Sequence, residues 1–104
     1  MEDVAAAFVA CARASVEGAH ACNLRGSIME VEEFVRAIRA AEPGAAIRSS
    51  GDPLPFACDV REDGLEAIIG PVPLTPVDVG VRRTAERFRD LHAAGRLPVG
   101  DLES

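Results

Sequence analysis

The sequence predicts an α+β fold of one domain, residues 1–104, with two N-terminal helices, a three-stranded antiparallel meander and a C-terminal helix. Two observations carry this prediction. Apolar residues recur at three- and four-residue spacing in three stretches, as in amphipathic helices. Between the second and third stretches, two apolar-rich runs flank Asp63-Gly64, a dipeptide typical of tight hairpin turns. We therefore expect the helices to pack on one face of a small sheet.

The predicted hairpin covers residues 55–70. A type I′ turn requires positive φ, which Gly64 adopts freely. The resulting register pairs Arg61 with Glu66 across the strands, an opposite-charge pair that supports it. An edge strand over residues 45–49 would complete the meander. The apolar face of the hairpin then consists of Phe56, Cys58, Val60, Ala67 and Ile69.

The first two predicted helices precede the hairpin. The first covers residues 2–22, although Gly18 weakens its end. Its expected buried stripe consists of Val4, Phe8, Cys11, Ala12, Ser15, Val16 and Ala19. The second helix is expected to begin at a capping box formed by Ser27 and Glu30, and to end near Pro43 and Gly44.

The third predicted helix begins at Thr75 and Pro76, because Thr is a good N-cap residue and Pro suits the first helical position. Gly95 is expected to end it. Residues 97–104 form an acidic tail that we expect to be frayed.

Composition narrows the classes of function. The net charge of −6 and the isoelectric point near 4.8 argue against nucleic acid or an anionic membrane as the partner. The sequence shows no signal peptide and no apolar run long enough to span a membrane, so a cytoplasmic location is expected. Three cysteines, an odd number far apart, favour buried free thiols over disulfides.

No motif predicts catalysis, and an enzyme is not expected. The sequence lacks phosphate-binding, dinucleotide-binding and hydrolase signatures, so no catalytic or cofactor-binding residue is assigned. No metal site is predicted either, since the cysteines and histidines lack the spacing of a zinc site. Those candidate ligands are Cys11, His20, Cys22, Cys58 and His92.

Two surfaces are predicted to contact a partner. One is apolar and follows the hairpin, and it consists of Ile68, Val72, Leu74 and Val77. The other is a basic face on the last helix, formed by Arg82, Arg83, Arg87 and Arg89. The leading hypothesis is a small acidic module, such as an adaptor or an inhibitor, that binds another protein chain or a second copy of itself.

Two alternatives remain open at this point. The first is a nucleic-acid-associated regulator that uses the arginine-rich last helix. The second is a small-ligand-binding protein or an enzyme with a pocket between the sheet and the helices.

Overall fold

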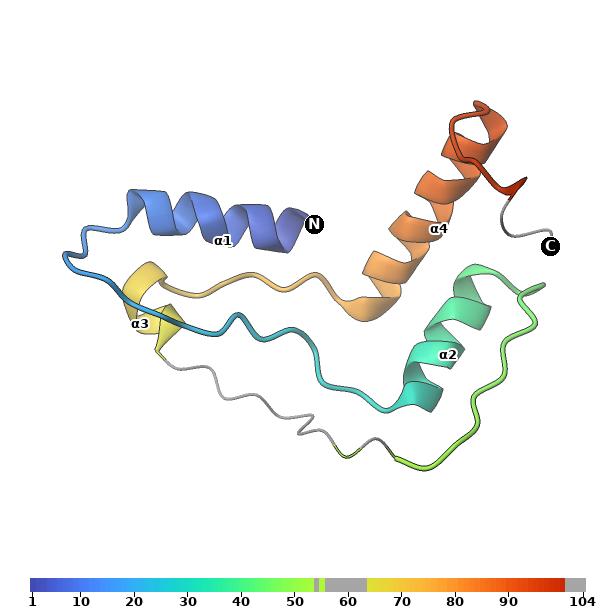
Figure 1. Cartoon of the computed structure of the whole chain (residues 1–104), viewed down its shortest axis with the longest axis horizontal. Coiled ribbons are helices and arrows are strands. Elements are labelled where there is room, and N and C mark those ends of the chain that lie inside the picture. The colour runs from blue at the N-terminus through green and yellow to red at the C-terminus, as the bar shows by residue number, and fades with distance from the viewer. Residues whose placement is uncertain (54, 56–63, 101–104) are drawn as a thin grey trace. The chain divides into compact units, whose positions relative to one another are not determined.

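The structure, a computed structural model, describes residues 1–53, 55 and 64–100, and within these ranges it contains four helices and no β-strand. Residues 14–30, between α1 and α2, and residues 70–76, between α3 and α4, contain no helix or strand (Figure 1). They are α1 (Glu2–Arg13), α2 (Val31–Ala41), α3 (Leu65–Ile69) and α4 (Val77–Ala93).

The chain divides into two compact units, and each unit combines two stretches that are far apart in the sequence. Unit 1 contains Met1–Ile28 and Gly51–Thr75, with α1 packed against α3. Unit 2 contains Met29–Ser50 and Pro76–Ser104, with α2 packed against α4. The single domain over residues 1–104 stays a prediction.

The predicted α+β fold is wrong, because the described residues contain no strand. Leu65–Ile69 was expected as the second strand of the hairpin and instead forms α3. Residues 45–49, the expected edge strand, have no regular structure. A five-residue segment is too short for the spacing of its apolar residues to separate a strand from a helical turn, and Leu, Glu and Ala favour the helix. The rest of the hairpin, residues 56–63, lies outside the described residues.

Gly64 has the positive φ that the hairpin prediction required, at +80°. It is the N-cap of α3, however, so the left-handed residue leads into a helix and not into a strand. A Cβ atom at this position would meet no atom within 4 Å. The preference for glycine therefore comes from the backbone conformation alone.

α1 is shorter than predicted, since it ends at Arg13 and not near residue 22. Gly18 has a φ of +93°, which is incompatible with a continuing right-handed helix. The charges of α1 suit the helix dipole, with Glu2 and Asp3 in the first turn and Arg13 in the last.

α2 begins at Val31, so the capping box predicted from Ser27 and Glu30 is wrong. The box occurs three residues later: the backbone amide of Glu30 donates to the Glu33 carboxylate at 3.2 Å. Both boxes fit the sequence, but only the later one places an acid at the third residue of the observed helix. The predicted end before Pro43 is confirmed, because α2 ends at Ala41.

α4 starts close to the predicted position, but Thr75 does not cap it. Pro76 is the N-cap residue and makes no side-chain hydrogen bond, while the Thr75 side chain bonds to Asp3 in α1. The predicted end at Gly95 is confirmed within two residues: the helix ends at Ala93, and Gly95 has a φ of +64°.

Buried apolar side chains are few. Within the described residues they are Ala7 and Leu65 in unit 1 and Val35 in unit 2. Larger apolar side chains on the same helices are exposed, and Phe8 in α1 is 73% exposed. Large apolar side chains of α1, α2 and α4 are therefore in contact with water.

We predict that Gly64→Ala lowers the free energy of unfolding by about 1 kcal/mol, because Ala resists a left-handed φ. The measurement is urea denaturation followed by circular dichroism. Gly44→Ala is the matched control, since Gly44 has open space around a Cβ and no positive φ. Equal effects of the two substitutions would contradict the assigned backbone at Gly64.

We predict that Glu33→Ala costs about 1 kcal/mol of stability by removing the acceptor for the Glu30 amide. Glu32→Ala is the control in the same helical turn, and Ser27→Ala should be neutral because Ser27 lies outside α2. Urea denaturation measures the stability of all three variants. A larger loss of stability with Ser27→Ala than with Glu33→Ala would support the capping box predicted from Ser27 and Glu30.

Candidate protein-binding surface

Two hydrogen bonds fix the start of α1 in unit 1. The Thr75 backbone amide donates to Asp3 Oδ2 at 2.9 Å, and the Thr75 hydroxyl donates to Asp3 Oδ1 at 2.6 Å. Both bonds are partly buried and join residues 72 positions apart. Because one carboxylate accepts both bonds, they set the rotation of α1 as well as its position.

The inward side of α1 is lined by small side chains. Ala7 is buried, and Asp3, Ala10 and Ala14 are half-buried at helical spacing from it. Small side chains allow close approach between α1 and α3, which pack against each other in unit 1. This side of α1 is occupied within the unit.

A different side of α1 carries exposed apolar side chains, which we call the α1 stripe: Val4, Phe8 and Cys11. These residues are four and three positions apart, so they lie along one side of the helix. They were predicted to be buried, and this prediction is wrong. The rotation set by Asp3 turns the alanine side inward and leaves the stripe in solvent.

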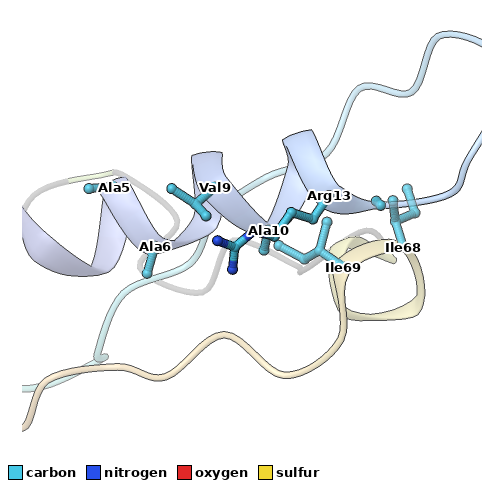
Figure 2. Close-up of a pocket in the computed structure, with 8 residues that line it drawn as sticks. Ala5, Ala6, Val9, Ala10, Arg13, Ile68 and Ile69 are labelled. Atoms are coloured by element: carbon cyan, nitrogen blue, oxygen red, sulfur yellow. The ribbon is translucent and has the colours of Figure 1, made fainter.

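An open groove of about 590 Å³ runs between α1 and α3, and we call it the α1–α3 groove (Figure 2). The Arg13 side chain runs back along α1 towards Ala10 at its edge (Figure 2). Apart from Arg13, all side chains that line it are aliphatic, so the groove offers no acid, base or nucleophile. The lining residues are Ala5, Ala6, Val9, Ala10, Arg13, Ala14, Ile68 and Ile69.

The predicted apolar surface is divided between the two units. Ile68 lines the α1–α3 groove, and Val72 and Leu74 line a smaller hollow of about 90 Å³, also in unit 1. Val77 is the first residue of α4 and belongs to unit 2. Partner binding by these four residues stays a prediction.

The predicted basic residues of α4 lie on two sides of the helix. Arg82 and Arg89 are seven residues apart and share one side, while Arg83 and Arg87, four apart, share another. All four are exposed. The arginines therefore form two pairs and not one continuous basic face.

Arg89 is engaged inside unit 2. Its Nε donates to Glu42 Oε2 at 3.0 Å, and its Nη2 donates to the same oxygen at 2.5 Å and to the Ala41 carbonyl at 2.9 Å. The guanidinium thus neutralises an acid and satisfies a carbonyl at the end of α2. Arg89 has a structural contact that the sequence did not reveal.

Unit 2 also exposes apolar side chains. Val35 in α2 is buried, but Phe34 and Phe88 remain 44% and 52% exposed. Val31, at the start of α2, is exposed as well. Unit 2 therefore exposes two aromatic side chains and one branched aliphatic side chain on its two helices.

The cysteines do not match the expectation of buried thiols. Cys11 is exposed and Cys22 is half-buried, and both are free. Cys58 lies outside the described residues. In the part of the chain that the structure describes, no group of three or more His, Cys, Asp or Glu residues is arranged to hold a metal ion.

Comparison with protein-family models, curated proteins and solved structures finds no match to this chain. None of the helices in the described ranges is long and apolar enough to cross a membrane. The functional assignment therefore depends on the surfaces of the two units. Sequence analysis placed three phenylalanines in the apolar patterns of the predicted helices, but it did not assign them, or Val9 and Arg13, to a binding surface. The phenylalanines are Phe8, Phe34 and Phe88.

We predict that Thr75→Val lowers stability by about 1–2 kcal/mol, because it removes the hydroxyl bond to Asp3 while keeping the side-chain shape. Thr84→Val is the matched control, since the Thr84 hydroxyl bonds only to the Gly80 carbonyl in its own helix. Thermal unfolding measures both variants. Equal losses would show that the Asp3 bond does not hold unit 1 together.

Proposed function

We propose that this chain is a small, non-enzymatic protein-binding module that buries exposed apolar side chains of α1, α2 and α4 against another protein chain. The observation that carries the proposal is the imbalance between buried and exposed apolar side chains. Three are buried in the described residues, whereas Phe8, Phe34 and Phe88 are all exposed.

This imbalance has an energetic consequence. Ordering the backbone costs about 1–2 kcal/mol for each residue, and burial of apolar surface is the main compensation. The four described helices make two contacts, α1 with α3 and α2 with α4, and these contacts bury few apolar side chains. Binding a partner would add the missing burial and stabilise the folded helices through mass action.

The other two functions have weaker support. Nucleic-acid binding would require a continuous basic surface, yet the α4 arginines occupy two sides and Arg89 contacts Glu42. Small-ligand binding would require convergent polar groups, yet the α1–α3 groove is open and mostly aliphatic.

We predict that a photoreactive benzophenone side chain at position 8, 34 or 88 crosslinks the full chain to protein in cells of its source. The matched controls are positions 32 and 86, which lie on the opposite sides of α2 and α4 from Phe34 and Phe88. We expect discrete protein adducts from the apolar positions only.

Mass spectrometry of the adducts identifies the partner. Equal crosslinking at all five positions, or none at the three phenylalanines, would contradict the protein-binding proposal. Adducts with nucleic acid would support the regulator alternative instead.

A further inference from the structure

We propose that residues 71–75, which we call the proline segment, form an ordered polyproline II ridge that binds a groove lined by tryptophan and tyrosine side chains on another protein. The ridge consists of Pro71, Pro73 and Leu74. The proposal goes beyond the function proposed above, because it concerns the segment between α3 and α4 and not the exposed side chains of α1, α2 and α4. The whole segment belongs to unit 1.

The covalent structure of the proline segment restricts its backbone to extended conformations. The ring of proline holds φ at about −65°, which applies to Pro71 and Pro73. A residue that precedes proline is disfavoured in the helical region, which applies to Val72 and Thr75. The next residue, Pro76, has a φ of −53° and a ψ of 142°, close to polyproline II values. The sequence therefore favours a polyproline II backbone.

The burial of the side chains follows the period of this backbone. Residues 70–76 contain no helix or strand, and no cis peptide bond occurs in the described residues. Polyproline II has three residues per turn, so residues three positions apart share one edge. Val72 and Thr75 are half-buried, whereas Pro71, Pro73 and Leu74 are exposed. One edge of the segment therefore faces the rest of unit 1, and two edges face solvent.

The inward edge is anchored at two points. The Thr75 backbone amide and hydroxyl donate to the Asp3 carboxylate at 2.9 Å and 2.6 Å. Val72 lines the hollow of about 90 Å³ together with Leu65, which is buried. The segment is thus ordered before a partner binds, so binding does not have to order it.

The outward edges form an apolar ridge. Pro71 and Leu74 share one edge, and Pro73 lies on the other. Leu74 also borders the hollow, but it remains 44% exposed. No charged residue occurs in the segment. The exposed surface is therefore made of two proline rings and one branched aliphatic side chain.

The chemistry of this ridge identifies the class of partner. Aromatic faces pack against proline rings, and the N–H of tryptophan or the O–H of tyrosine donates to the carbonyl groups of a polyproline II backbone. Grooves lined by aromatic side chains therefore recognise proline-rich segments. A second copy of this chain cannot supply such a groove, because the sequence contains no Trp and no Tyr. The partner must therefore be a different protein.

The first test uses the absence of tryptophan from this chain. The full chain is titrated into a purified SH3 domain and, separately, into a purified WW domain, whose grooves are lined by aromatic side chains. Tryptophan fluorescence then reports on the probe domain alone. We expect a saturable change with at least one probe and a dissociation constant in the micromolar range. No change with either probe would overturn the proposal.

Substitutions on the ridge locate the contact. Pro73→Ala and Leu74→Ser should each weaken probe binding by about tenfold, because each removes part of the apolar ridge. Pro43→Ala is the matched control, since Pro43 is an exposed proline outside the segment. Circular dichroism should show unchanged helix content in all three variants. Equal effects of Pro73→Ala and Pro43→Ala on binding would contradict the ridge.

The anchor is tested by a substitution that leaves the ridge itself intact. Thr75→Val removes the hydroxyl bond to Asp3 and should weaken probe binding by loosening the segment. Thr84→Val is the control, because the Thr84 hydroxyl bonds to the Gly80 carbonyl within α4. Unchanged binding of Thr75→Val would contradict an ordered ridge held by Asp3.

The outcomes separate this proposal from the function proposed for the helices. Phe8→Ser, Phe34→Ser and Phe88→Ser should leave probe binding unchanged, because these residues lie on helices outside the segment. Loss of probe binding in these variants, with Pro73→Ala unaffected, would assign the contact to the helices and overturn the ridge. Probe binding without crosslinks at the phenylalanines would support the ridge and contradict the helix surfaces.

Discussion

The two hydrogen bonds from Thr75 to Asp3 determine which side of α1 faces the interior of unit 1. They turn the side with Ala7 towards α3, and Phe8 is therefore left in solvent. The exposed stripe and the open groove are both consequences of this rotation. A helix with a larger aliphatic residue at position 7 would bury more surface but would be held further from α3.

In unit 2 a different polar contact positions the two helices. Val35 in α2 is its buried apolar side chain among the described residues, and Arg89 joins α4 to the end of α2 by bonding to Glu42 and to a backbone carbonyl. Exposed ion pairs contribute little stability on their own, but this one is supported by a bond to a helix-end carbonyl. Both units thus use polar contacts between distant residues to position helices that share little apolar contact.

The sequence predicted three of the four helices and the ends of α2 and α4, because their apolar spacing and their Gly and Pro residues are local signals. It also predicted a positive φ at Gly64, but not the helix that follows. The features that the sequence did not predict depend on polar contacts between residues that are far apart in the chain. Thr75 was expected to cap α4 and instead bonds to Asp3. A local sequence pattern cannot reveal a bond between residues so far apart. The same bond sets the rotation of α1, and the stripe that was predicted to be buried is therefore exposed.

The interleaved order of the two units constrains how this chain folds during synthesis. α1 is synthesised before its partner Thr75, which follows Asp3 by 72 residues. α2 is likewise synthesised before α4, against which it packs. Neither unit can close on a partial chain, so its helices emerge with their apolar sides uncovered, and folding depends on slow closure of long loops. The Asp3–Thr75 bonds of unit 1 therefore form only after Thr75 has been synthesised, and the α2–α4 contact of unit 2 only after α4 has been synthesised.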